Sequence, residues 1–295
     1  MREQEVSRTA LATAYLRAAH QILDGAELIL KDPIAIKLLD YGAESPINES
    51  TQSFKAERFK TERFDTPEDR ALRCHVVLRS RYAEDRLSAA VKRGVTQYVL
   101  IGAGFDTFAL RQPDWAKQLT IVEVDHPATQ LVKRQRIAAA GLGLPGNLRF
   151  ADIDFESESL LDGLTRHKVL TDRPTFFSWL GVSMYLTESA IDKTIQDVAS
   201  FPKGSELVMT FSQPPAANRG ASIVVAARLA QRVADAGEPF ISFFDPAELE
   251  RKLLEAGFDG VEFLTPALAK SRYFDSIATS LPSPKRISIV AAIRR

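Results

Sequence analysis

The chain has 295 residues, 45% hydrophobic and 26% charged, so it is long enough to bury a sizeable core. Its 38 Lys and Arg balance its 38 Asp and Glu, which indicates neither a nucleic-acid groove nor an anionic membrane surface. The single cysteine, Cys74, excludes an internal disulfide and a cysteine-rich zinc site, and the four histidines lack metal-ligand spacing. This pattern of cysteine and histidine predicts no metal ion. Because no apolar run reaches signal or membrane-spanning length, we expect a cytoplasmic protein.

The first 94 residues are expected to form a helical cap with three helices. Ser7 can cap the first, and Asp32-Pro33 supplies the N-cap and first-turn proline of the second. Apolar residues at helical spacing predict the third, which Gly94 ends. The expected ranges are 10–18, 34–39 and about 72–93. The charged segment Glu49–Arg70 is interpreted as mobile or partly helical, and as a lid over a site.

From Thr96 onward, strand-like runs alternate with helical patterns, which is typical of a parallel α/β sheet with right-handed crossovers. The predicted strands cover 97–101, 119–124, 148–152, 175–180, 206–211, 260–264 and 286–293. The predicted helices include 127–140, 187–201 and one that Asp245-Pro246 begins and Gly257 ends. The stretch Thr265–Lys285 shows no regular crossover helix, so the last two strands are expected to pair antiparallel at one edge. Without a repeat or flexible linker, we expect one domain over 1–295, with its core over 95–295.

The most informative motif is an apolar strand that ends in Gly102-Ala103-Gly104, since glycines let the backbone approach a ligand closely. A dinucleotide fingerprint needs a third glycine, but Thr107 stands there and Asp106 precedes it. A carboxylate in this turn repels a pyrophosphate, whereas it tolerates the ammonium and sulfonium groups of S-adenosylmethionine. The turn therefore favours S-adenosylmethionine over a nicotinamide cofactor.

Carboxylates follow the next two strands, where an open α/β sheet binds its ligand. Glu123 and Asp125 lie on one face of a strand, and either could accept the hydroxyls of a ribose. The alternative is that Asp125 only caps the helix that follows. Asp152 could accept the amino group of adenine while Ile153 packs on the ring, although both could simply mark the exit of a strand.

Two arginines and a tyrosine complete the candidate site. Arg79 or Arg81 could hold the methionine carboxylate through parallel hydrogen bonds, but Arg81 could equally form a surface pair with Asp85 at i,i+4. Tyr185 follows the fourth strand and either lines an acceptor pocket or packs in the core. No catalytic residue is identified from the sequence.

Taken together, these motifs resemble the leucine carboxyl methyltransferase superfamily. The segments that carry the resemblance are 100–107, 123–127 with Lys133, and 151–153. Three further segments, 7–10, 32–35 and 79–85, resemble signatures of its bacterial branch, which includes polyketide O-methyltransferases. The resemblance extends from Ser7 to the last strand.

The resemblance implies a class I, Rossmann-like methyltransferase that binds S-adenosylmethionine. Its implied contacts are Arg81, or in second place Arg79, for the methionine carboxylate, Gly102 for the cofactor backbone, Asp125 for the ribose, and Asp152 with Ile153 for the adenine. One departure is Leu180, because many relatives carry an acid after the aromatic residue of the fourth-strand motif.

We therefore expect an S-adenosylmethionine-dependent O-methyltransferase with a small-molecule acceptor, either a carboxylate or a phenolic or enolic hydroxyl. A carboxylate is ionised at neutral pH and needs no general base, and no histidine stands out as one, which favours the carboxylate. One alternative is a nicotinamide-dependent oxidoreductase, against which Thr107 and the antiparallel edge argue. Another is a non-catalytic cofactor-binding protein of the same fold.

Overall fold

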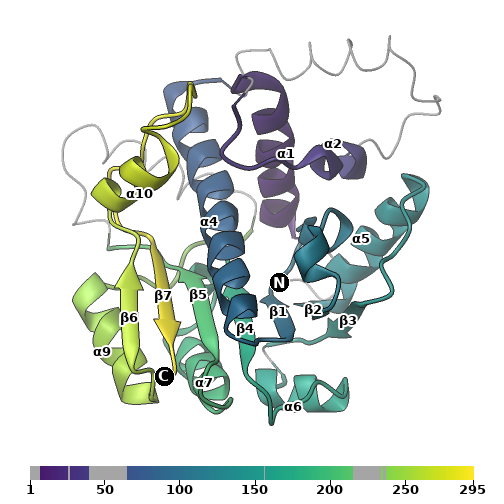
Figure 1. Cartoon of the computed structure of the whole chain (residues 1–295), viewed down its shortest axis with the longest axis vertical. Helices are drawn as coiled ribbons and strands as arrows, with labels where there is room; N and C mark the ends of the chain where they lie inside the picture. The colour runs from purple at the N-terminus through teal and green to yellow at the C-terminus, as the bar shows by residue number, and fades with distance from the viewer. Residues whose placement is uncertain (1–6, 26, 40–64, 156, 215–233, 235–236) are drawn as a thin grey trace.

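The computed structural model describes residues 7–25, 27–39, 65–155, 157–214, 234 and 237–295. Its centre is a seven-stranded sheet of order β3-β2-β1-β4-β5-β7-β6 (Figure 1). The strands are β1 (Gln97–Ile101), β2 (Thr120–Asp125), β3 (Leu148–Asp152), β4 (Thr175–Trp179), β5 (Glu206–Thr210), β6 (Gly260–Phe263) and β7 (Ile289–Ile293). The first five are parallel, and β7 runs antiparallel to both β5 and β6. The predicted fold class is confirmed, and β7 lies between β5 and the outermost strand β6.

Helices cover both faces of the sheet. The α-helices are α1 (Arg8–Leu23), α2 (Pro33–Leu39), α4 (Pro67–Lys92), α5 (Pro127–Ala139), α6 (Leu160–Arg166), α7 (Glu188–Ala199), α9 (Pro246–Ala256) and α10 (Pro266–Tyr273). Short 3-10 turns are η2 (Phe108–Leu110), η3 (Asp114–Ala116) and η4 (Ser183–Tyr185). Helices α4 and α10 pack with η2 and η3 on one face, and α6, α7 and α9 pack on the other. None of the helices in the described residues is long and apolar enough to cross a membrane.

Cover on both faces explains why the central strands β1, β4 and β5 are buried along their whole length. Side chains of a strand alternate between faces, so Val99 and Ile101 point toward α6, α7 and α9, whereas Tyr98 and Leu100 point toward α4. All five residues of β1 are buried for this reason, as expected of a parallel strand covered on both sides. The carboxyl ends of the parallel strands are left as the place where a site can form.

Capping residues set where the N-terminal helices begin. Ser7 accepts a hydrogen bond from the backbone N–H of Ala10, and Asp32 accepts one from Ala35 at 3.0 Å, as predicted for α1 and α2. Helix α4 begins at Pro67 rather than near Leu72, because Thr66 caps it. The end of the predicted mobile segment 49–70 is therefore its first turn, and residues 49–64 lie outside the described residues.

The interpretation of Thr265–Lys285 as irregular was wrong over its first part, where α10 forms. Thr265 accepts a hydrogen bond from the N–H of Leu268, and Pro266 occupies the first turn, the same start that was recognised at Asp245-Pro246. Ala269 and Tyr273 are buried against α4, and this burial stabilises so short a helix.

Helices α1 and α4 lie side by side (Figure 1), and a buried ion pair joins Asp24, at the end of α1, to Arg73 of α4. Arg73 donates two hydrogen bonds of 2.6 Å to the carboxylate of Asp24, whose Oδ2 is also 2.8 Å from His20 Nδ1. All three residues are almost fully buried. The partners hold the pKa of Asp24 below its usual value even though burial alone would raise it.

Candidate functional site

The glycine turn, residues 102–107, leaves β1 at the carboxyl edge of the sheet. Gly102 and Gly104 have φ of 67° and 51°, a region that favours glycine. Asp125, at the end of β2, accepts hydrogen bonds from the N–H of Gly104 and, at 2.7 Å, from that of His126. Its carboxylate therefore fixes the turn, and the cap of α5 is His126, which accepts from Ala128. Burial raises the pKa of Asp125.

Asp106, within the same turn, is paired with a cation from α1. Arg17 Nη1 lies 3.1 Å from Asp106 Oδ2, and the guanidinium also donates to the carbonyl of Phe105. Burial would raise the pKa of Asp106, but Arg17, Lys133 and Arg111 together hold it below its usual value. The turn thus presents an ionised carboxylate.

Arg79 lies on the face of α4 that points to this edge. Its guanidinium fills the space beside Gly181, where an added Cβ would come within 2.4 Å of Nη1. No carboxylate among the described residues forms an ion pair with it, and the neighbouring Leu180 is partly buried against the hydrophobic cluster that includes α4. Burial and the nearby charge of Arg17 lower the pKa of Arg79 to about 10. Arg79 is therefore a half-buried cation that feels the charge of Asp106 but forms no ion pair with a carboxylate in the described part of the chain.

Arg81 lies elsewhere on α4. Its Nε is 2.9 Å from Asp85 Oδ1, and both side chains are more than two-fifths exposed. The guanidinium also donates to the carbonyl of Ile29 and stacks on Tyr273. The pair of Arg81 with Asp85 is the surface pair predicted as the alternative role for Arg81. Of the two arginines, Arg79 is the one close enough to Arg17 and Asp106 to feel their charges.

Three other candidates have structural partners. Glu123 is buried, and its carboxylate forms a 2.5 Å ion pair with Lys133. Thr107 is buried and donates a 2.6 Å hydrogen bond to Asp32, the cap of α2. Ile153 is fully buried against Gly163 of α6, which leaves its side chain no surface for an adenine ring.

Asp152 keeps an accessible carboxylate at the end of β3. Asp152 lies directly beside Asp125 in the register of β2 and β3. Its side chain is about half exposed, and Oδ1 lies 2.9 Å from His167 Nε2. The two carboxylates therefore stand next to each other along the carboxyl edge, where a ribose and its base would lie.

Tyr185 lies in η4, which follows β4, on the other side of β1 from Asp125 and Asp152. Its ring centroid is 5.3 Å from that of Phe240. Burial raises the pKa of Tyr185, against the opposing effects of a hydrogen bond with Thr9 and the charge of Arg79. Glu238 accepts hydrogen bonds from Thr9 at the start of α1, so the first turn of α1 closes over this side. These aromatic and polar groups are suited to contact a small acceptor.

His75 is a residue that the sequence reasoning missed. It precedes Arg79 by one turn of α4, and its Nδ1 lies 3.3 Å from Ser288 Oγ, just before β7. Burial and the charge of Arg79 lower the pKa of His75 to about 3. The spacing of His75 and Arg79, four residues apart on one helix, was a local signal that the two side chains are neighbours. Arg17 instead binds Asp106, 89 positions away, and Glu238 binds Thr9, 229 positions away, and no local pattern reveals such contacts.

We predict that His75 makes the protein sensitive to acid. Because its folded pKa lies below the ordinary value near 6.5, the unfolded chain binds the proton first. The free energy of unfolding should therefore fall between about pH 6.5 and pH 3, by at most about 1.4 kcal/mol per pH unit from this group. Urea unfolding of His75→Gln at several pH values should show a shallower slope than the wild type, and an equal slope would contradict the assignment.

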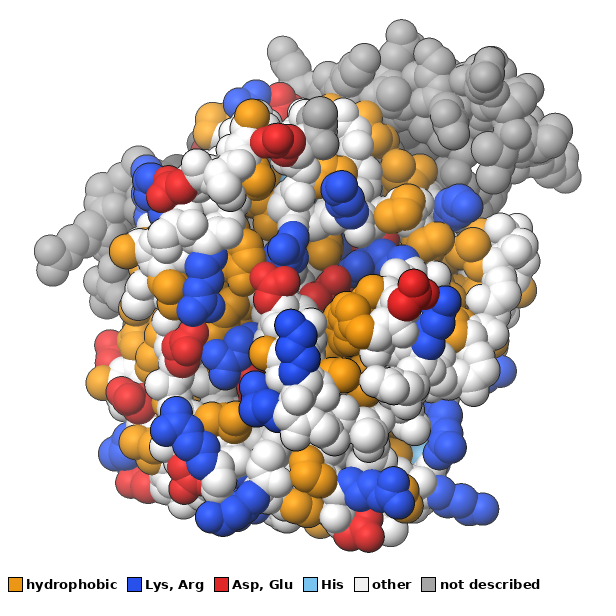
Figure 2. All heavy atoms as spheres, in the orientation of Figure 1, with side chains coloured by type: hydrophobic (Ala, Val, Ile, Leu, Met, Phe, Trp, Pro, Cys, Tyr) orange, Lys and Arg blue, Asp and Glu red, His pale blue; other side chains and the backbone are white. Residues whose placement is uncertain are grey.

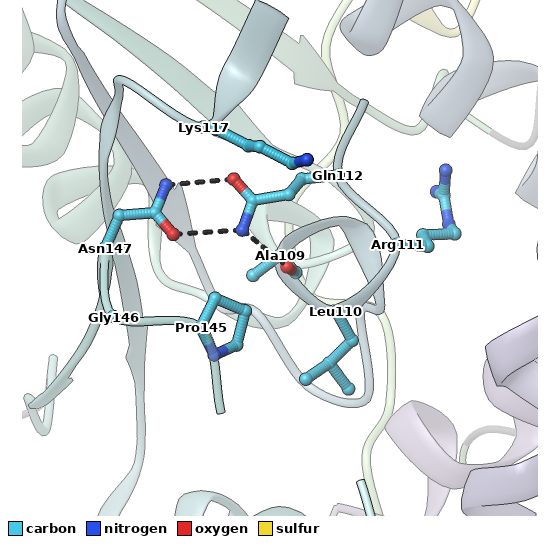
Figure 3. A pocket seen from close by; sticks show the side chains of 8 residues that line it. All are labelled: Ala109, Leu110, Arg111, Gln112, Lys117, Pro145, Gly146 and Asn147. Atoms are coloured by element: carbon cyan, nitrogen blue, oxygen red, sulfur yellow. Dashed lines mark hydrogen bonds between the residues drawn. The ribbon is translucent and has the colours of Figure 1, made fainter. Parts of the chain in front are cut away.

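A hollow at the amino ends of the strands is separate from this site, which lies at their carboxyl ends (Figure 3). It is lined by Ala109, Leu110, Arg111, Gln112, Lys117, Pro145, Gly146 and Asn147. Gln112 and Asn147 exchange two amide hydrogen bonds of 2.9 Å across it, while Arg111 points away toward Glu84. Asn147 immediately precedes β3, so this hollow lies at the amino ends of the strands.

Neither the face shown in Figure 2 nor any grouping of metal-ligating side chains in the described part of the chain adds a second candidate site. Figure 2 shows basic and acidic side chains interspersed on one face, without a patch of a single sign. No cluster of three or more His, Cys, Asp or Glu side chains that could hold a metal ion occurs among the described residues.

Comparison with known proteins agrees with this geometry. Residues 10–199 match the model of the leucine carboxyl methyltransferase family. The chain is 30% identical over 306 residues to the "Putative S-adenosyl-L-methionine-dependent methyltransferase YktD" of Bacillus subtilis (strain 168), and the match covers all of both proteins.

Solved structures share the fold. A DUF574 family protein from Streptomyces avermitilis superposes with a TM-score of 0.57 at 17% identity, over 99% of both chains. A "putative methyltransferase" from Thermobifida fusca superposes with a TM-score of 0.53 at 16% identity, over 76% of this chain and 83% of the other. With the glycine turn, the edge carboxylates and these relatives in agreement, the chain belongs to the leucine carboxyl methyltransferase family and is an S-adenosylmethionine-dependent methyltransferase.

Proposed function

We propose that this enzyme is an O-methyltransferase that methylates a small molecule, with a carboxylate as the favoured acceptor and a phenolic or enolic hydroxyl as the second. The observation that carries the placement of the cofactor is the half-buried guanidinium of Arg79, which lies beside Gly181 and forms no ion pair with a described carboxylate. A half-buried guanidinium without an ion-pair partner loses part of its hydration, and the carboxylate of a bound methionine group would compensate for this loss.

The remaining residues fit S-adenosylmethionine in the same orientation. Asp125 uses each oxygen once, for Gly104 and His126, and retains lone pairs for ribose hydroxyls. Asp152, beside it, would accept the amino group of adenine. Asp106 is ionised but is paired with Arg17 at 3.1 Å, so it would serve the site by shaping the turn. Arg79, Asp125 and Asp152 would thus hold the two ends and the middle of the cofactor.

Bound S-adenosylmethionine supplies a methyl group that its sulfonium makes electrophilic. The protein then needs chiefly to hold an acceptor oxygen in line with that methyl, which is a positioning effect. Tyr185 and Phe240 provide an aromatic wall for the acceptor. Helix α1 closes over the turn, with Ala10 Cβ within 3.3 Å of where a side chain at Gly104 would begin, and so excludes water.

The pKa values of Tyr185 and His75 favour a carboxylate acceptor over a hydroxyl. Tyr185 has a raised pKa and remains protonated at neutral pH, so its hydroxyl can donate a hydrogen bond. His75, with a pKa near 3, is too weak a base to take a proton efficiently from a hydroxyl. Neither side chain supplies a general base, and an ionised carboxylate needs none.

Calorimetry and an acceptor screen test the proposal. We expect S-adenosylhomocysteine to bind saturably and to raise the melting temperature by mass action, and we expect no response to NAD or NADP. A panel of aliphatic and aromatic carboxylic acids and of phenols, assayed for methyl ester or ether by mass spectrometry, should yield esters. Methylation at nitrogen, carbon or sulfur would overturn the proposal, and ethers alone would favour the hydroxyl.

A further inference from the structure

Arg17 joins helix α1 directly to the glycine turn. The side chain is 7% exposed, and its guanidinium donates to the carbonyl of Phe105 and, at 3.1 Å, to Asp106 Oδ2. Its Nε lies 3.8 Å from Asp32, which caps α2. One buried cation therefore ties together the first two helices and the turn that follows β1.

The backbone hydrogen bonds of the glycine turn leave the Phe105 carbonyl and one oxygen of Asp106 without a described backbone donor, and Arg17 supplies a donor to each. Asp106 N–H donates to the carbonyl of Ala103 at 2.8 Å, and Ala103 N–H donates to Val124 at 2.9 Å, which closes one side of the turn. Asp106 Oδ1 accepts from the N–H of Phe108 at 2.7 Å. The carbonyl of Phe105 and the second oxygen of Asp106 are satisfied by Arg17.

The same turn presents Gly104 to Asp125. Because Gly104 and Asp106 are two residues apart, releasing the Phe105 carbonyl and the Asp106 carboxylate would let the Gly104 N–H move away from Asp125. The Asp125 carboxylate would then lose one of its two backbone donors and its orientation. A guanidinium matches such a pair of acceptors with a fixed geometry that a flexible ammonium reproduces only in part.

We infer that Arg17 is a positioning residue for the cofactor site, which holds the glycine turn, and through it Asp125, in the geometry that binds S-adenosylmethionine. The N-terminal helix is thereby a working part of the cofactor site and not only a cover. The inference rests on the proposed role of Asp125 toward the ribose.

Arg73 offers a matched control within the same cap. It is also a fully buried arginine that ties α1 to the rest of the protein, through Asp24. Asp24 lies seven residues beyond Arg17, which is about 10 Å along a helix. Removing either guanidinium should destabilise the cap, but only Arg17 contacts the glycine turn.

The experiment compares full-length Arg17→Met, Arg17→Lys and Arg73→Met by calorimetry with S-adenosylhomocysteine and by thermal unfolding. We expect Arg17→Met to weaken binding about tenfold or more, and Arg17→Lys to restore a substantial part of the affinity. Arg73→Met should lower the melting temperature at least as much while changing the dissociation constant less than twofold. This pattern would separate positioning from general stability.

Other outcomes overturn the inference in recognisable ways. Equal affinity of Arg17→Met and the wild type, or an equal loss in Arg73→Met, would show that Arg17 acts only on stability. If Arg17→Met does not fold, Asp106→Asn removes the partner carboxylate and should weaken binding similarly, and unchanged binding in that variant would count against the inference. Failure of the wild type to bind S-adenosylhomocysteine would instead refute the cofactor geometry of the proposed function.

Discussion

Replacing Arg79 with methionine should weaken the binding of S-adenosylhomocysteine by about 2–5 kcal/mol, the usual cost of removing one partner of a buried, hydrogen-bonded charge pair. The physical reason is that Arg79 forms no ion pair with a described carboxylate, and the repelling charge of Arg17 opposes the attraction of Asp106. Arg79→Lys should already lose part of the affinity, because an ammonium cannot form two parallel hydrogen bonds with a carboxylate. Calorimetry measures both changes.

Decarboxylated S-adenosylmethionine gives the control for the ligand, because it lacks the group in question. Arg79→Met should leave its binding unchanged while it weakens that of the intact cofactor. Arg81→Met gives the control for the protein: an exposed pair with Asp85 contributes only about 0–1 kcal/mol, so this variant should be almost silent. Equal losses for both ligands, or a larger effect at Arg81, would remove Arg79 from the carboxylate site.

Replacing Asp125 with alanine should weaken S-adenosylhomocysteine binding by about 1–3 kcal/mol, the cost of leaving hydrogen-bonding partners unsatisfied. The side chain accepts from two backbone N–H groups, and we propose that it also accepts from the ribose hydroxyls. The fold should survive, since His126 and not Asp125 caps α5. Near-native circular dichroism and a cooperative melting transition would check this.

A double comparison separates the ribose contact from the effect on the turn. The 2′,3′-dideoxy analogue of S-adenosylhomocysteine lacks both hydroxyls, so Asp125→Ala should cost less affinity for this analogue than for the parent ligand. Asp152→Asn, the neighbouring carboxylate of the same edge, should show the same cost for both ligands. If Asp125→Ala costs both ligands equally, the residue acts only by holding Gly104.

Local signals in the sequence determined the secondary structure and the fold class. Strands β1 and β3 and the caps Ser7 and Asp32 follow from a few neighbouring residues, because a short strand-like run bounded by turns and a helix cap are both local signals. The glycine turn with its carboxylate likewise indicated the cofactor, since its chemistry lies within six residues. Helix α10 begins with the same local signal, the cap Thr265 followed by Pro266 in the first turn, although this helix was not predicted from the sequence.

Only the tertiary structure decided which of the candidate side chains face the site. Arg79 and Arg81 are two positions apart, about 200° around a helix of 3.6 residues per turn, so the packing of α4 on the sheet sends one to the turn and the other to the surface. Glu123 has a helical side chain, Lys133, as its partner, and Arg17 reaches a turn 89 residues away. These partners come together only when α1, α4 and α5 pack on the sheet, because contacts between distant segments depend on their packing and leave no periodic trace in the sequence.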